Sequence, residues 1–448
     1  MSLRDDAIAI WKAGVESVDS SAAVQQAVQF TGQRLRIAGV ELALAQGARI
    51  EVLGAGKAGA GMAAGIESAL LTVLPDVKLS GWVNVPADCV RRLQRIYLHA
   101  ARPAGINEPT QDAVEGTKEI LRRSRALEPQ DLCVVLLSGG ASALLCSPPP
   151  QIALAHKLAV IRALADSGAP IHELNLVRTQ LSQVKGGRLA AACTAGTLVT
   201  LIISDVIGDP LEVIGSGPTV DSPRRSEEAL QILSERGLMN SVPASVMGYL
   251  REPLTTPHRQ SPTCTVTNSI VASNRIALAA SAATAEQLGY SAVSLGSENA
   301  GDAATHGRVL FEQMLTAKRT SANERLCILS GGEPTVNLSS ATAANSSGKG
   351  GRNQELVLAA VAAHPDAAAW SGLALLSGGT DGEDGPTDAA GAFADEAIVR
   401  NVQRHYLQPA DFLARHDSWT FFSAVDGLLK TGPTHTNVMD LRVGLIAP

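Results

Sequence analysis

The chain has 448 residues, of which 45% are hydrophobic and 18% charged, and it carries a formal net charge of −6. This length and composition exclude a disordered chain and allow two or three domains with full hydrophobic cores. Aromatic residues make up only 3% of the chain, which argues against the stacking platforms of single-stranded nucleic-acid binders, and the negative charge provides no basic footprint. We therefore expect no nucleic-acid partner.

The six cysteines and the apolar runs indicate the compartment. No two cysteines form a C-x-x-C pair, so we interpret them as packing residues rather than as metal or redox sites. The first 14 residues hold no apolar stretch of signal-peptide length, and the longest apolar runs are far too short for a membrane span. We expect a cytoplasmic protein with no membrane partner. The sequence leaves the oligomeric state open, a homodimer included.

The first half of the chain alternates helical and strand patterns. Apolar residues at three- and four-residue spacings predict helices over 5–47, and a strand, a glycine-rich turn and a helix follow over 49–70. Further strands are predicted at 81–85, 95–98, 132–137 and 198–203, and helices at 108–125 and over 151–193. The last two of these strands are continuous apolar runs, which are typical of strands buried on both faces of a parallel sheet.

The second half repeats this alternation after a domain boundary near residue 255. The boundary is predicted from the stretch 250–262, which is rich in proline and lacks core periodicity. Beyond it we predict strands at 265–271, 291–295, 326–329 and 373–376, and helices at 273–288, 301–318 and 354–363. The sequence thus predicts an α/β protein of two domains, residues 1–255 and 256–448. It leaves open whether the last strand, 440–446, returns to the N-terminal sheet.

Glycine-rich or polar turns follow five of the apolar strands. Three strands end in Ser-Gly-Gly, at 138–140, 330–332 and 377–379, a fourth ends in GAGK at 54–57, and a fifth is followed by Ser204 and Asp205. In open α/β sheets, ligands bind outside the carboxyl ends of the strands. These turns therefore predict one polar crevice that accepts anions, with phosphate as the first ligand to consider.

The first of these turns is ambiguous by itself. Residues 54–59 fit the pattern G-x-G-x-x-G, and Asp76 follows about 20 residues later, as in dinucleotide-binding proteins. Lys57, however, adds a positive charge at the start of a helix, where backbone N–H groups already favour phosphate. The alternative interpretation is a tight turn with an incidental surface lysine.

Two further basic, glycine-rich loops favour an anionic ligand. They are residues 348–353, which contain Arg352, and residues 185–188, which begin with Lys185. Glycines let the backbone form an anion-binding nest, and an arginine can hold a carboxylate or phosphate through two parallel hydrogen bonds. The alternative is a flexible, solvated loop.

Acidic residues follow two of the strands, with Asp205 after one and Asp381 after the other. Mg²⁺ is usually held by one or two carboxylates together with phosphate oxygens and water, so these residues are the candidate metal ligands. Aspartate and glycine are also common turn formers, which is the structural alternative.

Taken in chain order, the motifs resemble those of one family. The segments that carry the resemblance are GAGKA (54–58), LSGGAS (137–142), VKGGRL (184–189), SDVIGD (204–209), IGSGPT (214–219), LSGGEPT (329–335), GGRNQE (350–355), SGGTDG (377–382) and TGPTHTNV (431–438). Together they are similar to the class II glycerate 2-kinases, whose C-terminal part is called the MOFRL domain. The resemblance spans nearly the whole chain.

The resemblance implies a Rossmann-like N-terminal domain with a parallel sheet flanked by helices, and a C-terminal MOFRL α/β domain. It implies an active site in the cleft between the two domains. The implied reaction transfers the γ-phosphoryl group of ATP to the 2-hydroxyl of D-glycerate, gives 2-phosphoglycerate and ADP, and requires Mg²⁺. Family members are often labelled hydroxypyruvate reductases, and we expect that label for similar proteins here.

The resemblance and the loop chemistry together assign roles to residues of this chain. Lys57 and Arg352 match the family's lysine and arginine in the first glycine loop and in the Gly-Arg-Asn-Gln-Glu motif, and they are the expected catalytic residues. The expected acceptor-binding residues are Ser138, Gly139, Gly140, Ser142, Lys185 and Asn353. The expected nucleotide-binding residues are Gly54, Gly56, Gly331, Gly332, Glu333, Gly378, Gly379 and Thr380, and the expected magnesium ligands are Asp205 and Asp381. The general base is unassigned.

The chain departs from the family pattern at residues 98–103, at Thr179 and Gln180, and at His435.

Two other functions stay open on the sequence alone. One is an NAD(P)H-dependent hydroxypyruvate reductase, which depends on the glycine pattern at 54–59. The other is a nucleotide- or carboxylate-binding regulator without turnover.

Overall fold

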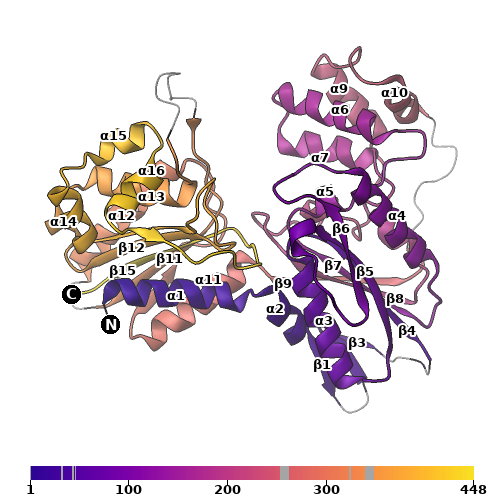
Figure 1. Cartoon of the computed structure of the whole chain (residues 1–448), viewed down its shortest axis with the longest axis horizontal. Helices are drawn as coiled ribbons and strands as arrows, with labels where there is room; N and C mark the ends of the chain where they lie inside the picture. Colours follow the sequence, from indigo (N-terminus) through magenta and orange to yellow (C-terminus); the bar gives the residue numbers. More distant parts are fainter. Residues whose placement is uncertain are drawn as a thin grey trace. The chain divides into compact units, whose positions relative to one another are not determined.

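The chain folds into two compact units in the computed structural model, which describes residues 2–31, 34–42, 45, 47–252, 262–321, 324–338 and 348–448 (Figure 1). The N-terminal unit comprises Ser20–Ile203 and Asp209–Val271. The C-terminal unit comprises Met1–Asp19, Ser204–Gly208 and Ala272–Pro448. The predicted boundary at residue 255 lies outside the described residues. Each unit is therefore built from separate stretches of the sequence. The first helix, for example, belongs to the C-terminal unit.

A six-stranded sheet forms the centre of the N-terminal unit, with the strand order β6-β5-β4-β7-β8-β9. The strands are β4 (Arg49–Ala55), β5 (Lys78–Pro86), β6 (Ile96–Arg102), β7 (Leu132–Leu137), β8 (Thr197–Ile203) and β9 (Thr265–Ala272). The pairs from β6 to β8 are all parallel. Every residue of β7 is buried, as are the last six of β8, so the prediction of a parallel sheet covered on both faces is confirmed here.

The strand order reverses between β4 and β7. The chain adds β5 and then β6 on one side of β4, and it adds β7, β8 and β9 on the other side. Ligands of doubly wound sheets bind at such a reversal, outside the carboxyl ends of the strands, because the two crossovers leave in opposite directions and open a crevice there. The turns after β4 and β7 therefore lie at the position in this sheet that is best suited to a ligand.

Helices cover this sheet and extend beyond its carboxyl edge. Helices α3 (Gly59–Val73) and α4 (Gln111–Arg125) pack on the strands. Four more helices, α6 (Leu154–Asp166), α7 (Ile171–Gln180), α9 (Ser226–Glu235) and α10 (Ala244–Arg251), pack around a shared apolar core (Figure 1). The short helices α5 (Ala141–Leu144) and α8 (Arg188–Ala192) follow two of the glycine-rich turns.

The segment 28–42 was predicted as helix, and that prediction is wrong. Helices α1 (Leu3–Ser17) and α2 (Ser20–Ala27) are present, but a small antiparallel sheet follows, made of β1 (Val28–Thr31), β2 (Arg34–Ile37) and β3 (Val40–Leu42). Its physical cause is visible in β2, where exposed and buried residues alternate. The connection from β2 to β3 uses Ala38 and Gly39, both with positive φ, which suits a tight hairpin turn.

The sheet of the C-terminal unit is mixed, with the order β10-β11-β15-β12-β13-β14. Its strands are β10 (Ser291–Ser294), β11 (Leu326–Gly332), β12 (Leu373–Gly379), β13 (Gly391–Asp395), β14 (Leu428–Leu429) and β15 (Asp440–Ile446). Among the described strands of this sheet, β10 and β11 pair in parallel and the other pairs are antiparallel. The α/β class is confirmed. β11 and β12 do not pair with each other, because β15 lies between them and is antiparallel to both.

Helices cover both faces of this second sheet. Figure 1 shows α1 beside α11 (Asn274–Gln287) on one face, and α12 (Ala303–Thr320) with α13 (Arg352–Ala363) on the other. The remaining helices of this unit are α14 (Glu396–Arg404), α15 (Pro409–Ala414) and α16 (Ser418–Ala424). None of the helices in the described ranges has the length and apolar character that a membrane span requires.

The antiparallel direction of β15 brings charged residues to the ends of two glycine-rich strands. Asp440, the first residue of β15, is paired with Gly332 at the end of β11 and with Gly379 at the end of β12. Arg442 lies two residues further along, between the Ser-Gly-Gly serines Ser330 and Ser377. The last strand thus belongs to the C-terminal sheet and supplies polar groups at the carboxyl edge of β11 and β12.

Candidate active site

The turns that follow β4 and β7 are bonded directly to each other. The Lys57 backbone N–H donates to the Gly139 carbonyl at 2.8 Å, and the Ala58 N–H donates to Ser138 Oγ at 3.1 Å. Gly56 has a φ of 153°, and a Cβ at this position would lie 2.0 Å from Ser138 Oγ. Only glycine therefore allows this contact, which holds Lys57 beside the Ser-Gly-Gly turn of β7.

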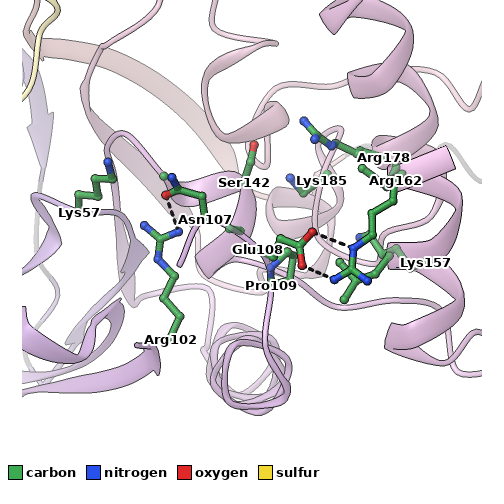
Figure 2. A pocket seen from close by; sticks show the side chains of 14 residues that line it. Lys57, Arg102, Asn107, Glu108, Pro109, Ser142, Lys157, Arg162, Arg178 and Lys185 are labelled. Carbon is green, nitrogen blue, oxygen red and sulfur yellow. Dashed lines mark hydrogen bonds and ion pairs between the residues drawn. The ribbon is translucent and has the colours of Figure 1, made fainter. Parts of the chain in front are cut away.

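A cavity of about 300 Å³ opens beside these turns, within the N-terminal unit (Figure 2). Its walls come from the turns after β4, β6 and β7, from helices α6 and α7, and from the loop before α8. The lining residues are Lys57, Arg102, Asn107, Glu108, Pro109, Gly140, Ser142, Ala143, Lys157, Leu158, Ile161, Arg162, Arg178 and Lys185. Six of these side chains are cationic and one is a carboxylate, so the cavity is suited to an anionic ligand.

One part of the cavity wall is formed by Lys57 and Arg102. A Cβ at Gly140 would lie 3.2 Å from Lys57 Cγ and 3.4 Å from Arg102 Nη2, so both side chains border the turn of β7. Arg102 donates from Nη1 to Asn107 Oδ1 at 3.1 Å, while its buried Nε has no partner among the described residues. Burial lowers the pKa of Arg102.

Another part of the wall holds two buried lysines. Lys185 Nζ donates to Ser216 Oγ at 3.1 Å, and Ser216 Oγ lies 3.2 Å from Ser142 Oγ. Burial, together with the positive charge of Lys157, lowers the pKa of Lys185 to about 7. Lys157 is only 3% exposed, and its ammonium has no hydrogen-bond partner among the described residues. Burial lowers the pKa of Lys157 as well.

The cavity contains part of the predicted site in the N-terminal half. Lys57, Gly140, Ser142 and Lys185 line it. Ser138 is buried and bonded to the first turn, as described above, and Gly54 packs against the Leu136 carbonyl, where a Cβ would lie at 2.4 Å.

Sequence reasoning missed four of the cationic residues of the cavity, namely Arg102, Lys157, Arg162 and Arg178. Arg102 belongs to the segment 98–103, which departs from the family pattern, and that departure was the available signal. Lys157 occupies a position of α6 that is otherwise apolar, since the buried residues of this helix are Lys157, Val160 and Leu164. Arg178, on α7, carried no comparable signal.

In the C-terminal unit, Arg352 is held by a fully buried carboxylate. Its Nε and Nη2 donate to the two carboxylate oxygens of Asp440 at 2.7 and 3.0 Å, and its Nη1 lies 3.0 Å from a Glu333 oxygen. Burial alone would lower the pKa of Arg352, but the hydrogen bonds and charge of Asp440 raise it above its usual value. Arg352 is therefore a fixed, permanent cation at the start of α13.

A second cation, Arg442, lies beside Asp440. Neither Arg442 nor Asp440 is identified as a site residue by the sequence patterns. The Arg442 guanidinium is 1% exposed, donates to Ser330 Oγ and to the Gly331 and Gly332 carbonyls, and lies 3.8 Å from a carboxylate oxygen of Asp440. Burial lowers the pKa of Arg442 to about 10. The side chains of β15 thus connect the turn of β11 with Arg352.

The predicted residues of the C-terminal half lie mostly around this pair. Gly331, Gly332 and Glu333 follow or end β11, and Gly378, Gly379 and Thr380 follow or end β12. Thr380 is fully buried and bonds to the Met439 carbonyl and the Val438 N–H. Asn353 is also buried and is bonded to Ser377 and Asp384. The polar side chains of Thr380 and Asn353 are therefore already hydrogen-bonded to other groups of the protein.

The metal candidates Asp205 and Asp381 both belong to the C-terminal unit. A Cβ at Gly379 would lie 3.0 Å from Asp381 Oδ1 and 3.6 Å from Asp440 Oδ1, so two carboxylates flank this glycine. Burial raises the pKa of Asp381, the Glu383 N–H opposes this, and the Asp440 charge raises it further. No group of three or more His, Cys, Asp or Glu side chains in the described ranges is arranged to hold a metal. Mg²⁺ needs only one or two carboxylates besides phosphate and water, and Asp381 fits that requirement.

We expect replacement of Asp440 by asparagine to lower the stability of the C-terminal unit. The change removes the charge that compensates Arg352 and Arg442, and breaking a buried ion pair on one side costs about 3–5 kcal/mol. Urea denaturation should therefore show a free energy of unfolding reduced by about 3 kcal/mol. The matched control is Asp388→Asn, since Asp388 pairs with Lys430 on the surface, where the loss should stay below about 1 kcal/mol. Equal effects of the two changes would contradict the role given to Asp440.

The chain matches proteins of one family over its whole length. Residues 326–440 match the MOFRL family model, and residues 6–251 match a domain of unknown function, DUF4147. The glycerate kinase of Homo sapiens is 35% identical over 506 aligned residues, which cover 100% of this chain and 94% of the relative. A protein of Agrobacterium vitis named as a putative hydroxypyruvate reductase is 40% identical and covers 89% of this chain and 87% of its own, so the expected label does recur.

Solved structures agree with this grouping. The crystal structure of a glycerate kinase from Thermotoga maritima has a TM-score of 0.83 and 30% identity, and the match covers 99% of each chain. A protein from Pyrococcus horikoshii has a TM-score of 0.85 and 32% identity, over 100% of this chain and 99% of the other. The resemblance predicted from the motifs is confirmed, and the chain belongs to the glycerate kinase family that carries the MOFRL domain.

Proposed function

We propose that this protein is a kinase that transfers the γ-phosphoryl group of ATP to the 2-hydroxyl of D-glycerate and releases 2-phosphoglycerate and ADP. The observation that carries the proposal is the cation-lined cavity at the strand reversal of the N-terminal sheet. Its volume of about 300 Å³ suits a small anion. The proposed substrate, D-glycerate, is inferred from the names of the relatives, since several of them are glycerate kinases.

In this reaction the bond between the γ-phosphorus and the ADP oxygen breaks, and a bond forms between that phosphorus and the acceptor oxygen. The acceptor hydroxyl loses its proton, which is released to water. Phosphoryl transfer requires positioning and charge neutralisation more than covalent chemistry. Lys57, fixed by its backbone bond to Gly139, would neutralise charge on the transferred group. Gly140 and Ser142 would contact the acceptor from the turn of β7.

For the nucleotide we propose the glycine-rich strand ends of the C-terminal unit, with Gly331, Gly332, Glu333, Gly378 and Gly379. Arg352 would contact phosphate oxygens with the part of its guanidinium that Asp440 leaves exposed, since its side chain is 32% exposed. Mg²⁺, when bound, would neutralise charge on the ATP phosphates, and the predicted ligands Asp205 and Asp381 would hold it.

The reductase alternative is less well supported by the geometry. A dinucleotide site of the G-x-G-x-x-G type needs an acidic residue for the ribose at the ligand-binding edge of the sheet. Asp76, the candidate from the sequence, is exposed and precedes β5, whereas the ligand-binding edge is at the ends of the strands. We therefore interpret the shared name as a label within a kinase family.

The proposed function predicts that Lys57→Ala reduces kcat by about 100-fold or more, because transition-state electrostatics are lost. The measurement is ADP release with ATP, Mg²⁺ and D-glycerate, with 2-phosphoglycerate identified by mass. Lys118→Ala serves as control, since Lys118 is exposed on α4 outside the cavity, and it should leave kcat unchanged. A folded Lys57→Ala variant with normal kcat would remove Lys57 from the mechanism. Oxidation of NADH by hydroxypyruvate without ADP release would favour the reductase instead.

The affinity for D-glycerate should fall as the pH rises above about 7. Lys185 has its pKa lowered to about 7, so the free cavity loses positive charge above that pH, whereas the glycerate carboxylate stays charged. Bound glycerate favours protonated Lys185, and binding at pH 8 should therefore take up a proton. Calorimetric titrations without nucleotide, in buffers of different ionisation enthalpy, measure both effects. An affinity that is constant from pH 6 to 9 in the wild type would contradict this role of Lys185.

A further inference from the structure

Five of the six cations of the cavity form two separate groups. Lys57 and Arg102 border the turn of β7, as the space around Gly140 shows. Lys157, Lys185 and the half-buried Arg178 form what we call the buried cationic group. Their mutual repulsion appears in the lowered pKa of Lys185, to which both Lys157 and Arg178 contribute after burial. Figure 2 shows this group on the opposite side of the cavity from Lys57.

The buried cationic group has no carboxylate partner among the described residues. Lys157 has no oxygen or nitrogen partner and only the neutral Cys146 thiol close by, Lys185 donates to the neutral Ser216, and Arg178 donates to Asn175 at 3.3 Å. The other titratable groups that act on Lys157 and Lys185 are the Cys146 thiol and further cations. Arg162 shows the contrast, because in the same wall it forms an ion pair with Glu108.

Packing does not require a lysine at position 157. Its neighbours on the same face of α6, Val160 and Leu164, are core residues, so an apolar side chain would satisfy the fold at this position. Burial of an unpaired ammonium destabilises the native state. A charge that is retained in an apolar position, without a partner and in the wall of a cavity, indicates an anion that binds there.

The surroundings favour a carboxylate over a phosphate in this part of the cavity. The nearby backbone amides of Gly186 and Gly187 are already bonded to the Ser216 and Gly217 carbonyls at 3.0 and 2.8 Å, so they cannot form a phosphate cradle. Leu158 and Ile161 add apolar surface that suits a short carbon chain. The first group instead lies beside two glycine-rich turns, which is the arrangement that phosphoryl groups require.

We propose that the buried cationic group of Lys157, Arg178 and Lys185 binds the carboxylate of the acceptor, an inference that depends on the proposed function. The acceptor then lies with its carboxylate on this group and its hydroxyl towards Ser142 and Lys57. Ser216 links Ser142 with Lys185 and would orient the hydroxyl-bearing carbon. The acceptors would accordingly be short hydroxy acids, and neutral polyols would bind poorly.

The test compares D-glycerate with its neutral amide in calorimetric titrations of the wild type, Lys157→Met and Lys185→Met, without nucleotide. We expect each variant to raise the Kd of D-glycerate about 10- to 100-fold, the range for a hydrogen bond to a charged group, and to change the Kd of the amide less than about threefold. Lys118→Met, on the exposed face of α4, should change neither value.

Thermal denaturation of the same variants distinguishes a binding residue from a structural one. Because Lys157→Met removes an unpaired buried charge, its melting temperature should equal or exceed that of the wild type, while its affinity for glycerate falls. A lowered melting temperature together with equal losses for glycerate and the amide would overturn the proposal.

The outcomes also separate this inference from the proposed function. If the wild type releases ADP with D-glycerate but both variants keep its Kd, the kinase function stands and the carboxylate assignment fails. If glycerate binds in a Lys157-dependent manner but no ADP is formed, the assignment stands and the kinase function fails. If glycerate does not bind to the wild type, both fail.

Discussion

The pairing of β4 with β7 at the strand reversal is the constraint on which the cavity depends. Crossovers leave these two strands in opposite directions, so their turns meet at one open edge of the sheet. The bond from the Lys57 N–H to the Gly139 carbonyl then fixes the lysine relative to the second turn, and Gly56 makes this approach sterically possible. The position of Lys57 is therefore set by backbone geometry, and its side chain needs no carboxylate to orient it.

The C-terminal unit orders its charges by a different means. Its two Ser-Gly-Gly strands do not touch, because β15 runs antiparallel between them and begins at the edge where they end. Asp440 is thereby buried between Gly332 and Gly379, where it would be unstable as a lone anion. Arg352 and Arg442 compensate it from two sides, so the guanidinium of Arg352 is held in one orientation by a charge that the sheet itself fixes.

Local sequence patterns were sufficient for strands buried on both faces and for residues in glycine-rich turns, which include Lys57. They failed for 28–42, because the apolar residues of a segment this short fit both helical and alternating spacings. They also could not give the direction of β15, since strand order depends on contacts between distant parts of the chain. Lys157 and Asp440 stand inside regular elements, and there the local pattern does not distinguish a buried ion from a solvated one.

The two units differ in whether their site cations have an internal carboxylate partner, and this difference agrees with the ligand proposed for each unit. Arg352 is neutralised by a permanent internal partner, so its orientation and charge are independent of any ligand. Lys157 has no such partner, and the native state is less stable until an anion enters. Because the ammonium is already desolvated in the folded protein, an anion gains the ion-pair interaction without this desolvation cost, whereas a neutral molecule of the same shape gains no such interaction. An uncompensated cation in the cavity is thus a means of selecting charge, obtained at the expense of stability in the empty protein.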